Sequence, residues 1–132
     1  MARILVLDDE EYVRNLVCEI VQRMGHTAIE AEDGKAALKK YTEGGIDLAI
    51  ADINMPEMDG ITFLEEAKKV DPHAVVIMMT GYPSAETIIQ TIEDDGYTYV
   101  AKPLKIDRLR DLIQRGLEAR KMRLQGKQGD QA

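Results

Sequence analysis

The feature of this sequence that most constrains its fold is a regular alternation of strand-like runs with segments whose apolar residues recur at helical spacing. Strand-like runs lie at residues 4–7, 26–31, 47–51, 74–79 and 97–101, and helical patterns lie at 13–24, 36–41, 60–70, 84–95 and from 106 onward. Strands that alternate with helices are typical of a parallel sheet with helices packed on it. We therefore expect an α/β fold.

The polarity of the strand-like runs indicates their order in the sheet. The first, third and fourth runs are apolar, as expected for strands buried on both faces, whereas the second and fifth also contain polar residues. Mixed runs at the two edges fit a doubly wound, five-stranded parallel sheet of order 2-1-3-4-5, with five helices on both faces. In that order a crevice forms between strands one and three, at their carboxyl ends.

Length and composition favour one globular domain in the cytoplasm. At 132 residues with 45% hydrophobic residues, the chain can bury a core of ordinary size. The apolar stretches are too short to cross a bilayer, we expect no signal peptide, and the single cysteine, Cys18, excludes a disulfide framework. We expect residues 1–119 to form the domain and residues 120–132 to be the C-terminal end of the last helix and a polar tail.

The charge of the chain is distributed unevenly. The formal net charge is -7, which disfavours non-specific binding of nucleic acid. From Lys105 onward there are eight Lys and Arg against four Asp and Glu, a net of +4, which leaves -11 on residues 1–104. A solvated helix face explains the basic segment most simply, and a docking surface for an acidic partner is the alternative.

Polar side chains follow four of the expected strands, at the point where each strand ends. They are Asp8 and Asp9 after the first strand, Asp52 after the third, Thr80 after the fourth and Lys102 after the fifth. Because the carboxyl ends of parallel strands meet at one edge of the sheet, we expect these groups to lie together.

The residue types at this edge predict phosphoryl chemistry. Clustered carboxylates repel one another, and a divalent cation relieves the repulsion. Oxygen ligands favour Mg²⁺ or Ca²⁺ over zinc, and Mg²⁺ takes one or two carboxylates together with phosphate oxygens. Lys102 can neutralise charge on a transferring phosphoryl group, Thr80 can donate a hydrogen bond to it, and one aspartate can be the nucleophile.

Four motifs together resemble the receiver domain of two-component response regulators, which has a flavodoxin-like fold. They are Leu-Asp-Asp-Glu at 7–10, Asp-Ile-Asn-Met-Pro-Glu-Met-Asp-Gly at 52–60, Met-Thr-Gly at 79–81 and Tyr-Val-Ala-Lys-Pro at 99–103. The resemblance covers about residues 3–118. It implies that Asp52 is the phosphoacceptor, that Thr80 and Lys102 bind the phosphoryl group, that Tyr99 is a rotating aromatic switch and that the Lys102–Pro103 peptide bond is cis.

The resemblance also implies a metal site and partners. Asp9, Asp52 and the backbone carbonyl of Asn54 are then direct Mg²⁺ ligands, with Asp8 acting through a metal-bound water. A sensor histidine kinase or a phosphotransfer protein would donate the phosphoryl group. Phosphorylation would change the surface of the fourth helix, fifth strand and fifth helix, for a downstream protein target or a phosphorelay. The domain would be no enzyme beyond its own phosphorylation and dephosphorylation.

Several alternatives stay open. Asp52 could be a turn residue, and Glu10 is more simply a first-turn acid than a metal ligand. A phosphohydrolase with an aspartyl-phosphate intermediate also needs an aspartate, a lysine and Mg²⁺, but the chain has no insertion large enough for a cap. A flavin-binding protein is disfavoured because Asp8 and Asp9 would repel its phosphate. The chain could be a stand-alone receiver or part of a longer protein, and a monomer or a phosphorylation-linked dimer.

Overall fold

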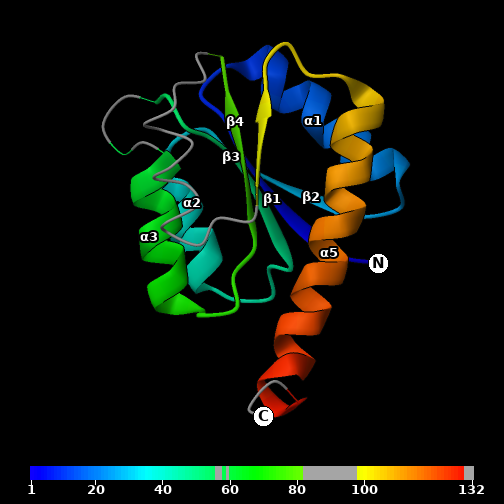
Figure 1. Cartoon of the computed structure of the whole chain (residues 1–132). Helices are drawn as coiled ribbons and strands as arrows, with labels where there is room; N and C mark the ends of the chain where they lie inside the picture. Colours follow the sequence, from blue (N-terminus) through cyan, green and yellow to red (C-terminus); the bar gives the residue numbers. More distant parts are fainter. Residues whose placement is uncertain (56–57, 59, 82–97, 130–132) are drawn as a thin grey trace.

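The computed structural model describes residues 1–55, 58, 60–81 and 98–129, and it contains one five-stranded sheet. The strands are β1 (Arg3–Leu7), β2 (Thr27–Ala31), β3 (Leu48–Asp52), β4 (Val76–Thr80) and β5 (Thr98–Ala101). The described helices are α1 (Glu11–Arg23), α2 (Gly34–Thr42), α3 (Gly60–Val70) and α5 (Ile106–Gly129) (Figure 1).

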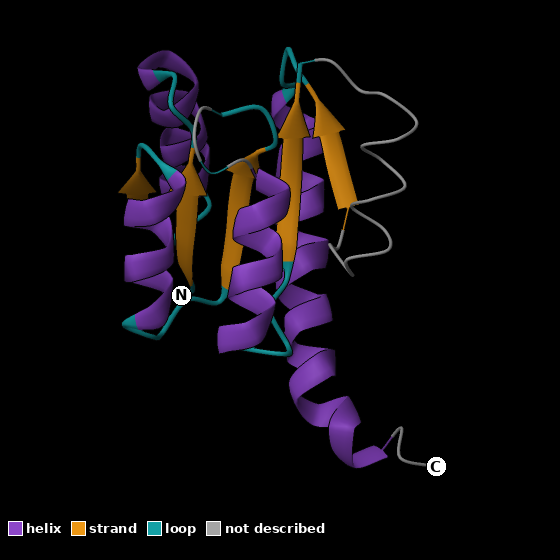
Figure 2. Cartoon of the chain, turned by 90° about the vertical axis from the view of Figure 1, so that its left-hand side faces the viewer, coloured by secondary structure: helices purple, strands orange, loops and turns teal. Residues whose placement is uncertain are grey.

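The strands are parallel and lie in the order β2-β1-β3-β4-β5, which confirms the predicted topology. The register pairs Leu7 of β1 with Ala51 of β3, so the ends of these two central strands are level. All five strands point the same way, and their carboxyl ends form one edge of the molecule (Figure 2).

Alternation along the strands divides the apolar side chains into two cores, one on each face of the sheet. In β1, Ile4 and Val6 pack in the core that α1 and α5 cover, whereas Leu5 and Leu7 pack in the core that α2 and α3 cover (Figure 1). All four side chains are fully buried, as are the apolar residues of β4. The sheet is therefore a rigid support for the loops at its carboxyl edge.

Local sequence signals mark the start of α2 and the end of α1. Asp33 is the N-cap of α2, where its side chain accepts a hydrogen bond of 2.7 Å from the backbone N–H of Ala36. Gly25 follows Met24, the C-cap residue of α1, and has a φ of 90°, a backbone conformation that favours glycine. Cys18 is buried in the core against the sheet, as expected for a small apolar residue.

Several boundaries differ from the sequence-based expectations. The fourth strand begins at Val76 rather than at residue 74, because Ala74 closes a turn by donating its N–H to the carbonyl of Asp71. The last helix continues through Gly129, further than the polar composition after residue 120 suggested. The helix expected at residues 84–95 lies outside the described residues, and so do the flanking residues Tyr82 and Tyr97. Within the described part of the chain, every helix is too short or too polar to cross a membrane.

Candidate functional site

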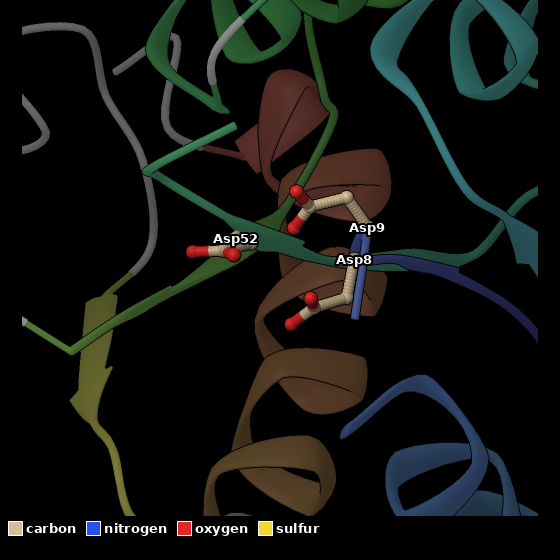
Figure 3. Close-up of side chains that lie close together, drawn as sticks. All are labelled: Asp8, Asp9 and Asp52. Carbon is tan, nitrogen blue, oxygen red and sulfur yellow. The ribbon is translucent and has the colours of Figure 1, made fainter. Parts of the chain in front are cut away.

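Three carboxylates meet at the carboxyl ends of β1 and β3. Asp8 and Asp9 come directly after β1, and Asp52 is the last residue of β3. Each contributes one oxygen to a group whose members all lie within 4.8 Å of one another. Figure 3 shows the side chains of Asp8 and Asp9 next to that of Asp52. The strand register therefore brings together the acids that the sequence placed at separate strand ends.

Lys102, directly after β5, lies between two of these acids. Its Nζ is 3.1 Å from Oδ2 of Asp8 and 3.1 Å from Oδ2 of Asp52, and 3.7 Å from Oε1 of Glu10. The backbone N–H of Lys102 donates a hydrogen bond of 2.8 Å to the carbonyl of Thr80, and the peptide bond from Lys102 to Pro103 is cis, as the resemblance implied. A single cation thus joins the ends of β1, β3 and β5.

Burial sets the electrostatics of this cluster. Asp8 is fully buried and Asp52 is 3% exposed. Burial and the charge of Asp8 raise the pKa of Asp52 above its ordinary value, although Lys102 and the N–H of Asn54 oppose the shift. Burial by itself would lower the pKa of Lys102, but the carboxylates of Asp8 and Asp52 outweigh it and hold that pKa above its ordinary value. Lys102 is therefore charged, and the cluster still carries excess negative charge.

Thr80 and Asn54 lie beside Asp52. The backbone N–H of Asn54 donates to Oδ1 of Asp52 at 3.1 Å, and its side-chain amide lies 3.4 Å from Oγ1 of Thr80. Thr80 is the last residue of β4 and is fully buried. Tyr99 lies on β5 in register with Met78 and packs partly buried against the core under α2 and α3. The carboxyl ends of β1, β3, β4 and β5 thus hold all the site residues expected from the sequence except Tyr99, which lies within β5.

A pocket of about 650 Å³ opens the cluster to solvent. Asp9, Asp52 and Lys102 line it together with Asn54, Gly81, Pro103 and the first turn of α1, including Tyr12 and Val13. Asp9 is exposed whereas Asp8 is buried, so the two adjacent acids face different surroundings. The pocket therefore leaves Asp52 open to solvent on one side.

The donor set fits a hard divalent cation. The three carboxylates offer oxygen atoms only, and their spacing leaves room for one ion to touch more than one of them. Their excess charge supplies a physical reason for a cation to bind. The chemistry of these donors matches Mg²⁺ or Ca²⁺ better than zinc, whose protein sites usually include nitrogen or sulfur ligands.

Two contacts at the site were not predicted from the sequence. Glu10 was expected to act only as a first-turn acid, but it also faces Lys102. Arg14 donates a hydrogen bond to the backbone carbonyl of Asp8, and no motif marks it. A helical projection would have placed Arg14 about one turn after Glu10 on the same face of α1, which is the one available signal.

Comparisons with known proteins agree with this geometry. The family described as the response regulator receiver domain matches residues 4–114. The chain is 37% identical over 116 residues to the chemotaxis protein CheY of Bacillus subtilis, covering 87% of this chain and 97% of that protein. It is 35% identical to the regulatory protein AtoC of Escherichia coli, but there it covers 92% of this chain and only 26% of that protein.

A solved structure shares both the fold and the sequence pattern. The response regulator protein TrrA of Thermotoga maritima, in complex with Mg²⁺-BeF, superposes with a TM-score of 0.80 at 34% identity, covering 88% of this chain and 99% of TrrA. The strand order, the acidic pocket at the ends of β1 and β3 and the match over residues 4–114 agree. The chain therefore belongs to the response regulator receiver domain family.

Proposed function

We propose that Asp52 is the phosphoacceptor of this receiver domain and takes a phosphoryl group from a phosphohistidine of a partner protein. The observation that carries the proposal is the position of Lys102, whose Nζ lies 3.1 Å from both Asp8 and Asp52. A lysine so placed neutralises charge on a group bound to Asp52, and a structural salt bridge would need only one of the two acids.

In the proposed reaction an Oδ atom of Asp52 attacks the phosphorus atom in line. The new O–P bond forms as the P–N bond to the donor imidazole breaks, and the imidazole nitrogen keeps the electron pair and takes up a proton. The Asp52 carboxylate must be ionised to attack, and Lys102 favours that form. Bound Mg²⁺ would neutralise charge on the phosphoryl oxygens. The chain holds the acceptor, the cation and the acids in place before the donor arrives.

Mg²⁺ is the cofactor that the proposal assigns to the acidic cluster. Asp9, Asp52 and the backbone carbonyl of Asn54 are the proposed direct ligands, and Asp8 is the proposed second acid that acts through a bound water. The exposure of Asp9 and the position of Asn54 in the same pocket support this division. The TrrA structure, solved with Mg²⁺-BeF, supports the choice of metal.

The proposed output is a switch that involves Thr80 and Tyr99. A phosphoryl group on Asp52 would accept a hydrogen bond from Thr80, whose Oγ1 lies 3.4 Å from the amide of Asn54. Movement of Thr80 would open space for Tyr99 to turn toward the sheet and change the surface of β5 and α5. A local change of charge would then shift the population of two surface states. Replacing Tyr99 by alanine should leave phosphorylation intact while removing the response of the partner.

The proposed partners are proteins. A histidine kinase or phosphotransfer protein would dock at the pocket around Asp52, and a downstream target would read the surface of β5 and α5. The basic residues from Lys105 onward suit an acidic target. The match covers only 26% of AtoC, so relatives exist in which further chain accompanies the receiver domain. Output through a further domain and output by direct contact with a target protein are therefore both compatible with the family.

The test is incubation with a small phosphodonor such as acetyl phosphate, with and without Mg²⁺, followed by intact mass analysis. The wild-type chain should gain one phosphate only when Mg²⁺ is present, and Asp52→Asn should gain none. Asp33→Asn is a matched control, because it makes the same chemical change at the N-cap of α2 and should be phosphorylated normally. A gain that persists in Asp52→Asn would show that the acceptor lies elsewhere. Multiple turnover on a phosphate ester would instead indicate a phosphohydrolase.

A further inference from the structure

We propose that Arg14 is a positioning residue that fixes the peptide between Asp8 and Asp9 and so sets the metal affinity of the acidic cluster. This inference rests on the proposed function of that cluster as a Mg²⁺ site. Arg14 does not touch the reacting atoms. It acts through the backbone from which two of the three carboxylates project.

The geometry places the guanidinium at the point where regular pairing of β1 ends. The ladder between β1 and β2 ends with Leu7 opposite Ala31. One residue further, the N–H of Asp8 still donates to the carbonyl of Ala31 at 3.3 Å. The carbonyl of Asp8 accepts a hydrogen bond of 2.9 Å from Nη1 of Arg14.

This hydrogen bond is well suited to hold the peptide in one orientation. Asp8 is fully buried and the side chain of Arg14 is only 13% exposed, so water competes weakly for either group. Hydrogen bonds from a charged donor are about twice as strong as neutral ones, and a buried carbonyl without a donor is costly. Arg14 lies in α1, so the bond also fixes the acidic loop to a helix packed on the sheet.

The consequence falls on both acids. The carbonyl that Arg14 holds belongs to the peptide unit whose nitrogen is that of Asp9, so rotation of this unit would turn Asp9 away from Asp52. On the other side, Oδ1 of Asp8 accepts a 2.8 Å hydrogen bond from the N–H of Glu10. A change in the peptide between Asp8 and Asp9 therefore disturbs the position of each carboxylate. Outer groups of this kind typically change metal affinity by about 10- to 100-fold.

A purely structural role has to be separated from this one, because Arg14 also forms an ion pair. Its Nε lies 3.2 Å from Oε1 of Glu30 on β2, and the Glu30 side chain is 53% exposed. Glu30→Gln removes the charge of this pair and leaves the bond from Arg14 to Asp8 in place. Arg14→Met keeps much of the aliphatic stem and removes both contacts, whereas Arg14→Lys keeps the positive charge and one possible donor group.

The experiment measures Mg²⁺ binding by titration calorimetry and amide hydrogen exchange of the metal-free proteins, using wild type, Arg14→Met, Arg14→Lys and Glu30→Gln. We expect Arg14→Met to raise the Mg²⁺ dissociation constant by about tenfold or more, and Arg14→Lys to restore part of the affinity. Glu30→Gln should change it by less than about twofold, because exposed ion pairs contribute little. The amides of Asp9 and Glu10 should exchange faster in metal-free Arg14→Met than in Glu30→Gln.

The phosphorylation rate gives an independent readout. With acetyl phosphate, Arg14→Met should need more Mg²⁺ for half-maximal rate and should approach the wild-type rate when Mg²⁺ saturates. Equal Mg²⁺ affinity of wild type and Arg14→Met, or an equal loss in Glu30→Gln, would overturn the inference and leave the proposed function standing. Failure of the wild-type chain to bind Mg²⁺ would overturn both.

Discussion

The charge of Asp52 is expected to cost the metal-free protein stability, so Asp52→Asn should be more stable than wild type at neutral pH. Asp52 is 3% exposed and shares a single lysine with Asp8. Burial and the charge of Asp8 raise the pKa of Asp52, which means that the ionised carboxylate is less favourable in the folded protein than in the unfolded chain. Asparagine has nearly the same shape, carries no charge and can still accept the hydrogen bond from the N–H of Asn54.

The distances give the size of the effect. The carboxylate oxygens of Asp8 and Asp52 lie within 4.8 Å of each other, so at an effective dielectric constant of about 20 their unit charges repel by at least about 3.5 kcal/mol. Lys102, at 3.1 Å, attracts Asp52 by about 5 kcal/mol on the same scale. The net attraction of Asp52 to these two neighbours is therefore at most about 2 kcal/mol, which is smaller than the several kcal/mol needed to desolvate a carboxylate. We therefore expect Asp52→Asn to gain about 1–2 kcal/mol, within the range of known stabilising substitutions.

The pH dependence distinguishes this cause from a packing effect. A carboxyl whose pKa is higher in the folded than in the unfolded state costs no stability below the ordinary pKa of 3.8, because both states are then protonated. The cost grows as the pH rises from 3.8 to the raised pKa and is constant above it. The advantage of Asp52→Asn should therefore be present at pH 7 and nearly absent near pH 3.5.

The assay is urea denaturation at both pH values in the presence of a chelator. Asp107→Asn is the control, because Asp107 is exposed in the first turn of α5 and its replacement should change stability by less than about 0.5 kcal/mol. Added Mg²⁺ should reduce the difference in stability between Asp52→Asn and wild type at pH 7, because a ligand that binds the native state of the wild-type protein stabilises that state. A variant that is less stable than wild type at pH 7, or equally displaced at both pH values, would refute the electrostatic reasoning.

Three further predictions concern other parts of the chain. Arg120→Met should lower the free energy of unfolding by about 1–3 kcal/mol at pH 7, because Arg120 outweighs the effect of burial and helps to hold the pKa of Asp71 below its ordinary value. The stability that this ion pair contributes is lost as the pH falls through the lowered pKa, so the urea curves of variant and wild type should converge in acid. Gly60→Ala should lower the stability by about 1–3 kcal/mol and slow acetyl phosphate labelling, because the added Cβ would press on the backbone of Asp52, and equal melting temperatures would contradict this. Burial raises the pKa of Cys18 to about 11, so a thiol reagent at pH 8 should react with it much faster in urea than in the native protein, and equal rates would show that the thiol is accessible.

The fold and the members of the site could be predicted because they depend on local pattern. The alternation of strand-like and helical segments indicated the α/β class, and the polarity of the strand-like runs indicated the sheet order. The polar residues after each strand predicted that Asp8, Asp52 and Lys102 are neighbours. Strand ends carry this information because parallel topology converts separate positions in the chain into adjacent positions in space.

Contacts between distant elements could not be predicted in this way. Arg14 and Arg120 both occupy helical positions whose polarity suggested solvent, yet each is less than one-fifth exposed and pairs with an acid on another element. Periodicity states which face of a helix is apolar but not where a long polar side chain ends. The start of β4 was misplaced for a related reason, since the apolar residues 74 and 75 belong to the core without belonging to the ladder.

The length of α5 has a mechanical consequence. Its 24 residues span about 36 Å, from the segment next to Lys102 to beyond the opposite edge of the sheet (Figure 2). Arg120 and Arg123 tie it to the loop before β4, through Asp71 and the carbonyl of Ala74, at more than half of its length. The first half of α5 packs in the core through Leu109, Leu112 and Ile113, so the two arginines extend the attachment of the helix into its second half. Because α5 is one continuous helix, we expect a displacement of its first turn, near the proposed phosphorylation site, to be transmitted toward its far end.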